Sequence, residues 1–254
     1  MTDEPYFRHD LALVQERAYG LHAERCAPGV LALLEPVRGG LVLELGCGTG
    51  ALTRHLLAAG HRVLATDASP AVLDVAREIL GPSAELATLA LPGDPVPEAD
   101  AIVSVGHPIS YLDSAADVDQ ALVALAGALR PGGVLAIDIC DLEWGTARTG
   151  ANNLGRVGPD WAVITEFSMP APDKFVRDIT TFVPDGNGAW RRDSEHHENV
   201  LVDTARIPGL LQGHGVTASV RSSFGTEQFP PGLKTVIGTR DRSPATGSPS
   251  EDRY

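Results

Sequence analysis

The chain has 254 residues, of which 43% are hydrophobic, and this is enough to bury the core of one large domain. It carries 33 acidic and 20 basic residues, for a formal net charge of −13, and no basic cluster larger than Arg191-Arg192. Because nucleic-acid binding depends on neutralising phosphates, this balance argues against a DNA or RNA partner. No apolar run reaches the roughly 18 residues of a membrane span, and residues 1–10 are charged, unlike a signal peptide. We expect a cytoplasmic protein without membrane or nucleic-acid partners, as a monomer or homodimer.

The cysteines and acids give no sign of a metal site or a disulfide framework. Cys26, Cys47 and Cys140 lie far apart in the sequence and form no CxxC pair. Asp138 and Asp141 have no partners at metal-ligand spacing. We therefore predict no bound metal.

The first 140 residues show helices and strands in alternation. Residues 6–34 have apolar positions at helical spacing, with a break expected near Pro28. Strands are predicted at 41–45, 62–66, 84–89, 100–105 and 134–139, and helices at 51–59, 70–80 and 115–129. Apolar strands that alternate with helices indicate a parallel sheet covered on both faces.

The pattern changes between residues 152 and 202. Segments 161–169, 175–183 and 189–201 are separated by prolines and by Asp185-Gly186-Asn187-Gly188, which are hairpin signals. We predict an antiparallel β insertion within a single domain of residues 1–240, whose residues 1–40 form a helical cap. A helix at 206–212 and strands at 217–224 and 233–239 follow, and residues 241–254 are expected to be a disordered tail.

The most informative segment is Val42-Leu43-Glu44-Leu45-Gly46-Cys47-Gly48-Thr49-Gly50, a strand that enters a glycine-rich turn. Glycine lets the chain reverse tightly and leaves the backbone open to a ligand. Gly46, Gly48 and Ala51 would also satisfy a loose dinucleotide-binding fingerprint. Two acids narrow the interpretation: Glu44 lies inside the strand, and Asp67 ends the next one.

This combination resembles motif I and the acidic motif of class I S-adenosylmethionine-dependent methyltransferases. The resemblance implies a doubly wound α/β, Rossmann-like sheet, mostly parallel with an antiparallel C-terminal strand. It also implies that Gly46, Cys47 and Gly48 pass under the methionine part of S-adenosylmethionine and that Asp67 accepts hydrogen bonds from the ribose hydroxyls. A diol donates and a carboxylate accepts, so this pair is complementary. The alternative is an NAD(P)-dependent oxidoreductase that uses the same turn.

Ligands of open α/β sheets bind outside the carboxyl ends of the strands. Leu89 and Leu91 would flank the adenine, although ordinary core packing explains them equally well. Tyr19 would reach the cofactor from the N-terminal helices. The full predicted cofactor set is Tyr19, Glu44, Gly46, Cys47, Gly48, Asp67, Ala68, Leu89, Ala90, Leu91 and Gly106.

The insertion resembles the lid of small-molecule N- and O-methyltransferases from bacterial natural-product pathways. The resemblance is carried by His9-Asp10-Leu11-Ala12, Gly106-His107-Pro108-Ile109-Ser110-Tyr111-Leu112, Asp160-Trp161-Ala162-Val163 and Arg191-Arg192-Asp193-Ser194-Glu195-His196-His197. Members of that family often carry an acid in place of His107 and Asn in place of Ser110. A small-molecule acceptor, methylated on oxygen or nitrogen, is what the resemblance implies.

Three residues are candidates for catalysis. His107 directly follows the strand at 100–105, and its imidazole could take a proton from an attacking group, or else orient the cofactor or the loop. His196 and His197 lie on a predicted strand and so face opposite sides. By resemblance we expect Glu195 and His197 to face inward; the alternative is a salt-bridged lid surface.

Overall fold

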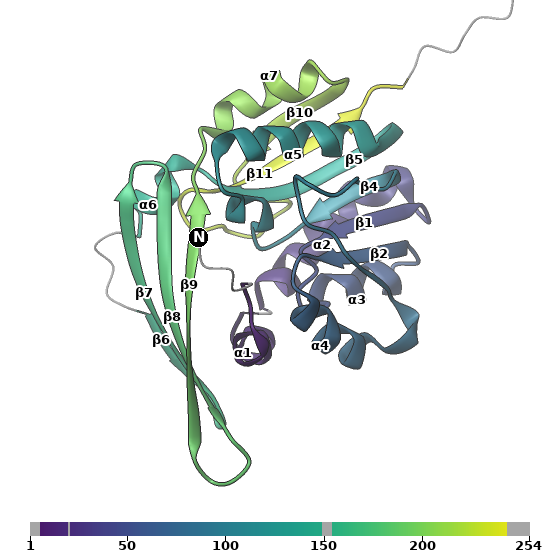
Figure 1. The fold of residues 1–254 in the computed structure, drawn as a ribbon. Helices are drawn as coiled ribbons and strands as arrows, with labels where there is room; N and C mark the ends of the chain where they lie inside the picture. Colours follow the sequence, from purple (N-terminus) through teal and green to yellow (C-terminus); the bar gives the residue numbers. More distant parts are fainter. Residues whose placement is uncertain (1–5, 20, 149–153, 243–254) are drawn as a thin grey trace, which may run out of the picture.

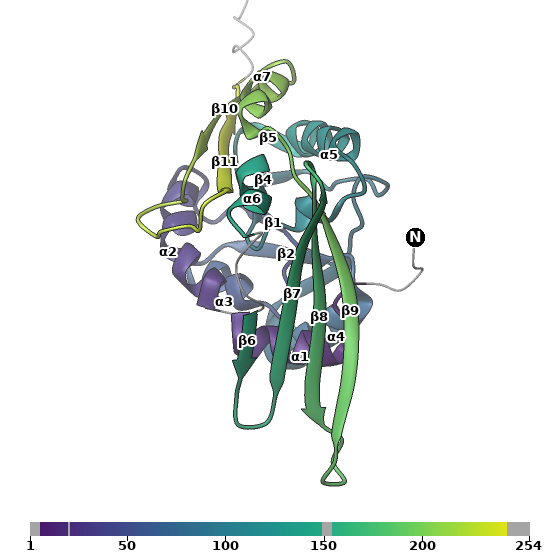
Figure 2. The same ribbon diagram turned by 90° about the vertical axis from the view of Figure 1, so that its left-hand side faces the viewer.

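The structure, a computed structural model, describes residues 6–19, 21–148 and 154–242 and contains two β-sheets (Figures 1 and 2). The larger has seven strands in the order β10-β11-β5-β4-β1-β2-β3. Their bounds are β1 (Leu41–Leu45), β2 (Arg62–Asp67), β3 (Glu85–Thr88), β4 (Ala99–Ser104), β5 (Leu129–Cys140), β10 (Val216–Arg221) and β11 (Leu233–Arg240). Only β11 runs antiparallel to its neighbours in this sheet, which confirms the predicted topology.

Helices cover both faces of the large sheet, as the alternating apolar strands predict (Figure 1). On one face, α5 (Ala115–Ala128) and α7 (Ile207–Gln212) pack on Leu43, Ile102 and Leu135. On the other face, α2 (Leu21–Leu34), α3 (Ala51–Ala58) and α4 (Pro70–Leu80) pack on Val42, Ala101 and Ala136. Neighbouring residues of one strand, such as Val42 and Leu43, thus pack into the hydrophobic cores on opposite faces of the sheet.

The break between the N-terminal helices lies near residue 20, whereas the sequence predicted it near Pro28. Pro28 lies inside α2, whereas α1 (His9–Tyr19) ends before it. A proline inside a helix removes one backbone hydrogen bond. Here the segment around Pro28 is held by burial, because Cys26, Ala27 and Val30 are at most 1% exposed. Tertiary packing therefore overrides the local signal.

The predicted insertion is a separate four-stranded antiparallel sheet, here called the lid, in the order β6-β7-β8-β9 (Figure 2). Its strands are β6 (Leu154–Val157), β7 (Ala162–Ala171), β8 (Lys174–Pro184) and β9 (Trp190–Val200). The sequence predicted three of them. All four residues of β6 are exposed, so this strand has no apolar alternation by which it could be recognised.

The lid joins the large sheet through two adjacent segments. α6 (Leu142–Thr146) follows β5, and η4 (Thr204–Arg206) follows the last lid strand. Val202 N donates to Cys140 O at 3.2 Å, and Thr204 N donates to the Asp141 carboxylate at 3.1 Å. The entry and exit of the lid are therefore bonded to each other.

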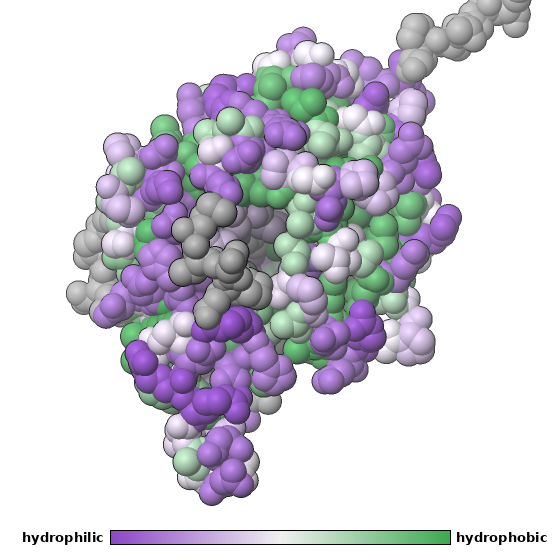
Figure 3. Space-filling model, in the orientation of Figure 1, coloured by the Kyte–Doolittle hydropathy of each residue, from purple (hydrophilic) through white to green (hydrophobic). Residues whose placement is uncertain are grey.

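The two faces of the lid differ in exposure. Phe175, Ile179 and Val183 of β8 are buried, and α1 packs on this inner face. On the outer face the exposed His196 and Asp178 pair at 2.7 Å. Figure 3 shows hydrophilic residues over the lower part of the lid, in keeping with an outer surface in water.

Residues 243–254, which make up most of the expected tail, lie outside the described chain. No helix in the described part of the chain is long and apolar enough to span a membrane.

Glu44 in β1 is a buried acid that accepts a side-chain hydrogen bond from the following helix. Its carboxyl group is 2% exposed and accepts a hydrogen bond from the Thr53 hydroxyl of α3 at 2.7 Å. Burial raises the pKa of Glu44 to about 8, although the Thr53 bond acts in the opposite direction. Glu44 thus links β1 to the helix after the glycine turn at an electrostatic cost.

We predict that Glu44 makes the protein less stable as pH rises. The unfolded chain releases this proton near pH 4.5 and the folded chain keeps it until about 8, so the free energy of unfolding falls across that interval. Glu44→Gln keeps an oxygen for Thr53 and should flatten this dependence. Urea unfolding at several pH values measures it, with the exposed Glu85→Gln as the control. An unchanged slope in Glu44→Gln would contradict the assignment.

Candidate functional site

A cavity of about 1320 Å³ lies between the carboxyl ends of the large sheet and the inner face of the lid. We call its two regions the turn end, formed by Gly46, Gly48 and Asp67, and the lid end, formed by Tyr111, Trp144, Arg148 and Arg177. The N-terminal segment also contributes Phe7 and Leu11 to the wall. The cavity is thus enclosed by three parts of the chain that are far apart in sequence.

The glycine turn after β1 has left-handed backbone angles, with φ of 63° at Gly46, 57° at Gly48 and 92° at Gly50. A Cβ at Gly46 would lie 2.7 Å from the Pro108 ring, so this glycine allows the turns after β1 and β4 to touch. A Cβ at Gly48 would meet no atom within 4 Å. Gly48 therefore leaves its backbone open toward the cavity, as the sequence predicts.

Asp67 holds the turn end together. Its carboxylate accepts hydrogen bonds from Gly48 N at 3.1 Å and from Ser69 N at 2.9 Å. Burial raises the pKa of Asp67 above its usual value, although these backbone donors act in the opposite direction. The carboxylate joins two adjacent strand ends and still lines the cavity.

Most of the predicted cofactor residues come together in the cavity wall. These are Gly46, Cys47, Gly48, Asp67, Ala68, Leu89, Ala90, Leu91 and Gly106. Glu44 does not belong to this wall, because its side chain points to Thr53 behind the turn. Glu44 therefore supports the glycine turn from behind, whereas the sequence predicted that it would contact the cofactor. The side chain of Tyr19 lies outside the described part of the chain.

Asp138 of β5 fixes the turn after β4. This carboxylate is fully buried and accepts from Gly106 N at 2.8 Å and His107 N at 2.7 Å. His22 Nε2 of α2 lies 3.3 Å from it. The sequence placed Asp138 near the carboxyl end of a strand and offered it as a possible metal ligand, but it did not predict these hydrogen bonds. The sequence did contain a signal for this role, because Asp138 is an acid inside the otherwise apolar segment of β5.

His107 lies at the junction of the two ends of the cavity. Its φ of 52° is left-handed, and its ring stacks on Tyr111 at 5.9 Å and meets Trp144 edge-on at 5.5 Å. Burial, and secondarily the Arg177 guanidinium, lower the pKa of His107 to about 3. Among the described residues its buried Nδ1 has no hydrogen-bond partner. The ring is therefore a neutral imidazole at physiological pH and a weak base.

Glu195 and His197 face inward, as the resemblance implied, but neither lines the cavity. The Glu195 carboxylate accepts from Phe7 N at 2.7 Å and Arg8 N at 2.9 Å, and it lies 2.9 Å from His197 Nε2. Burial lowers the pKa of His197. These two residues bind the N-terminal segment, which explains their burial without contact to the cavity.

Ion pairs reinforce the attachment of the N-terminal segment to β9. Arg8 pairs with Asp193 at 2.7 Å, and Asp10 pairs with Arg191. Tyr111 connects this cluster to the cavity, since its hydroxyl lies 3.4 Å from His197 Nδ1. The N-terminal segment and the lid thus form one wall.

Comparison of the sequence with known proteins identifies methyltransferases as its relatives. A family model for a methyltransferase domain matches residues 42–133. An uncharacterized methyltransferase of Mycobacterium bovis is 33% identical over 173 residues, which are 65% of this chain and 68% of the relative. A malonyl-[acyl-carrier protein] O-methyltransferase of Pectobacterium atrosepticum is 33% identical over 144 residues, or 54% of this chain. The chain spans 55% of that relative, about half its length.

Structural comparison gives the same fold. An S-adenosylmethionine-dependent methyltransferase from Clostridium acetobutylicum superposes with a TM-score of 0.77 at 19% identity, covering 91% of this chain and 97% of the other. The sugar N-methyltransferase KedS8 from Streptoalloteichus gives 0.72 at 20% identity, covering 95% and 96%. At these identities the likeness concerns the fold.

The chain belongs to the class I S-adenosylmethionine-dependent methyltransferases. The predicted family and the Rossmann-like α/β fold are confirmed. One protein of similar fold, the amino pentose methyltransferase CalS10, is 20% identical and has been solved with S-adenosylmethionine bound. The oxidoreductase alternative, which rested on the same glycine turn, is therefore set aside.

We predict that Glu195 is the main anchor of the N-terminal segment. Glu195→Ala removes a buried carboxylate that accepts two backbone hydrogen bonds, and such bonds to a charged group contribute about 1.5–3 kcal/mol each. The amides of Phe7 and Arg8 should then exchange with deuterium at least about tenfold faster. Asp193→Ala, which loses only the half-exposed pair with Arg8, should have a smaller effect. Equal exchange in the two variants would refute the assignment.

Proposed function

We propose that this protein transfers the methyl group of S-adenosylmethionine to an oxygen or nitrogen of a small metabolite, in natural-product metabolism. The size and form of the cavity carry this proposal. Its volume of about 1320 Å³ exceeds the roughly 300–1,000 Å³ of an ordinary small-molecule site, which leaves room for a cofactor and an acceptor. The similar fold of the sugar N-methyltransferase KedS8 favours the same class of acceptor.

The turn end fits the cofactor. Gly46, Cys47 and Gly48 would hold the methionine part, and Asp67 would accept from the ribose hydroxyls. The walls available to the adenine are apolar and small: Ala68, Leu89, Ala90 and Leu91. When bound, S-adenosylmethionine supplies an activated methyl group.

The remaining tasks belong to residues of this chain. The lid and the N-terminal segment would exclude water and align the acceptor. His107 lies between the two ends, and its neutral ring can accept a hydrogen bond from the N–H or O–H of an acceptor. We assign it this orienting role first and that of a weak general base second. Glu195 and His197 would act as positioning residues through Tyr111 and the N-terminal segment.

The cofactor assignment predicts binding that depends on Asp67. S-adenosylhomocysteine should bind with micromolar affinity in calorimetry, and NAD⁺ should not compete. Asp67→Ala should weaken binding by about tenfold to a hundredfold, because a charge-assisted acceptor for the ribose is lost. Asp74→Ala, at an exposed acid of α4 that pairs with Arg77 outside the cavity wall, is the control. Binding of NAD⁺ without S-adenosylhomocysteine would overturn the proposed function, and an unaffected Asp67→Ala variant would overturn the ribose contact alone.

The environment of His107 predicts an unusual pH dependence. Because its pKa is lowered to about 3, the His107 ring stays neutral as the pH falls from 7 to about 4. Protonation should impair its role in catalysis only below that range. The pH profile of kcat should therefore show no inflection near 6.5, the ordinary histidine value. His107→Ala should lower kcat about tenfold or more and leave the affinity for S-adenosylhomocysteine nearly unchanged. A loss of affinity at constant kcat would make His107 a cofactor ligand instead.

A further inference from the structure

Two arginines line the lid end of the cavity, each over a different ring of the aromatic cluster around His107. The Arg148 guanidinium carbon lies 3.6 Å from the ring centroid of Trp144. The Arg177 guanidinium carbon lies 5.3 Å from the centroid of Tyr111. Both rings contact His107, and both positive charges contribute to lowering its pKa. Two cations thus flank the ring beside which the acceptor would react.

Arg148 is a partly buried cation that has no acidic partner in the described part of the chain. Burial lowers its pKa, and its buried Nε has no hydrogen-bond partner within the described residues. No ion pair joins it to a carboxylate in residues 6–19, 21–148 and 154–242. Leaving a desolvated cation unpaired is unfavourable, so such a group is ordinarily matched by a counter-charge.

The acids of the described cavity wall have neighbours other than Arg148, and Asp113 interacts with Lys174. Asp138 accepts from two backbone amides, and Glu198 pairs with Lys174 at 3.0 Å. Asp67 lies at the opposite, turn end. No acid of the described residues therefore pairs with Arg148. Within the described residues, the counter-charge of Arg148 is left for a ligand to provide.

We infer that the methyl acceptor carries an anionic oxygen group, a carboxylate or a phosphate, that binds between Arg148 and Arg177. A guanidinium that stacks on an aromatic ring keeps its N–H groups in a plane parallel to the ring, and their outer edge can donate two parallel hydrogen bonds to such a group. Trp144 and Tyr111 provide flat apolar walls for the rest of the acceptor. This inference rests on the proposed function and specifies its acceptor.

Matched probes test the anion site without knowledge of the natural acceptor. Benzoate, phenyl phosphate and the neutral benzamide are titrated by calorimetry into the full-length protein, with and without S-adenosylhomocysteine. At least one anion should bind about tenfold or more tightly than benzamide, and the preferred anion separates a carboxylate from a phosphate site. Equal affinities, or no binding of either anion, would overturn the inference.

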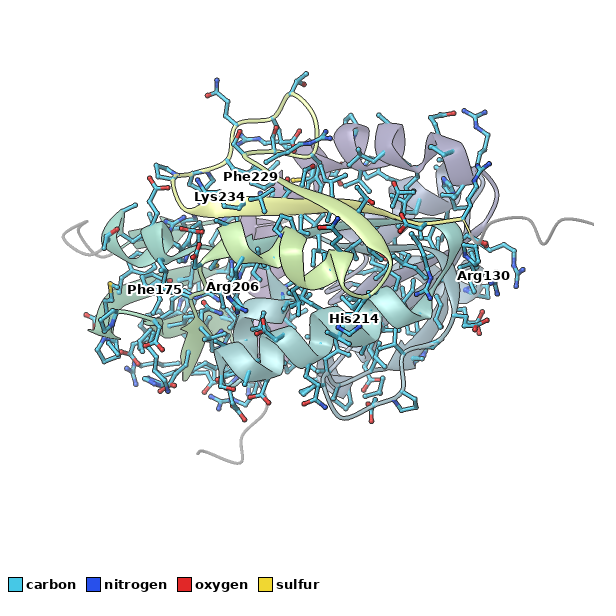
Figure 4. The ribbon with its side chains drawn as sticks, turned by 90° about the horizontal axis from the view of Figure 1, so that it is seen from above. Arg130, Phe175, Arg206, His214, Phe229 and Lys234 are labelled. Carbon is cyan, nitrogen blue, oxygen red and sulfur yellow. The ribbon has the colours of Figure 1, made fainter. Side chains whose placement is uncertain are left out.

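Variants connect the preference to the arginines. Arg148→Gln and Arg177→Gln should each reduce the preference about tenfold, whereas Arg148→Lys should keep part of it. Arg206→Gln serves as the control: it is a surface arginine paired with Asp119 beside α7, outside the cavity wall (Figure 4). Unchanged S-adenosylhomocysteine affinity shows that each variant is folded. If both Arg148→Gln and Arg177→Gln keep the preference for the anion over benzamide, the anion site is refuted. If the wild-type protein fails to bind S-adenosylhomocysteine, the proposed function itself is refuted.

Discussion

The buried carboxylate of Asp138 is the interaction on which the site depends. Its two backbone hydrogen bonds hold Gly106 and His107 in the turn after β4, and His22 approaches it from α2. With that turn fixed, the His107 ring can contact both Tyr111 and Trp144. A buried charge is tolerated only when it is well bonded, and here the donors belong to the segments that must be aligned.

The cavity has opposite electrostatic character at its two ends. Asp67 provides an acid at the glycine turn, whereas Arg148 and Arg177 provide cations under the lid. His107 lies between them and is kept neutral by burial and by the neighbouring cations. Under the proposed function, this separation would let one cavity distinguish a hydroxyl-rich ligand part from an anionic one, although the protein as a whole carries a net charge of −13.

The sequence predicted the large sheet and the turn end well because both depend on local patterns. Strands that alternate with helices and a turn that requires glycine leave signals within a few residues. It failed for Pro28, where burial overrides a helix breaker, and for β6, whose exposed residues have no alternation. The roles of Asp138, Arg148 and Glu195 arise from contacts between distant segments. No spacing in the chain encodes such contacts.

The join between the lid and the large sheet has a consequence for how such proteins diversify. Cys140 and Val202 are bonded to each other, and Asp141 is bonded to Thr204, so the inserted chain leaves the sheet and returns at one point. Strands can be lengthened, shortened or repatterned beyond that point without moving β5 or the glycine turn. Under the proposed function, mutations in the lid would therefore change the acceptor preference, while the residues of the turn end stay in place.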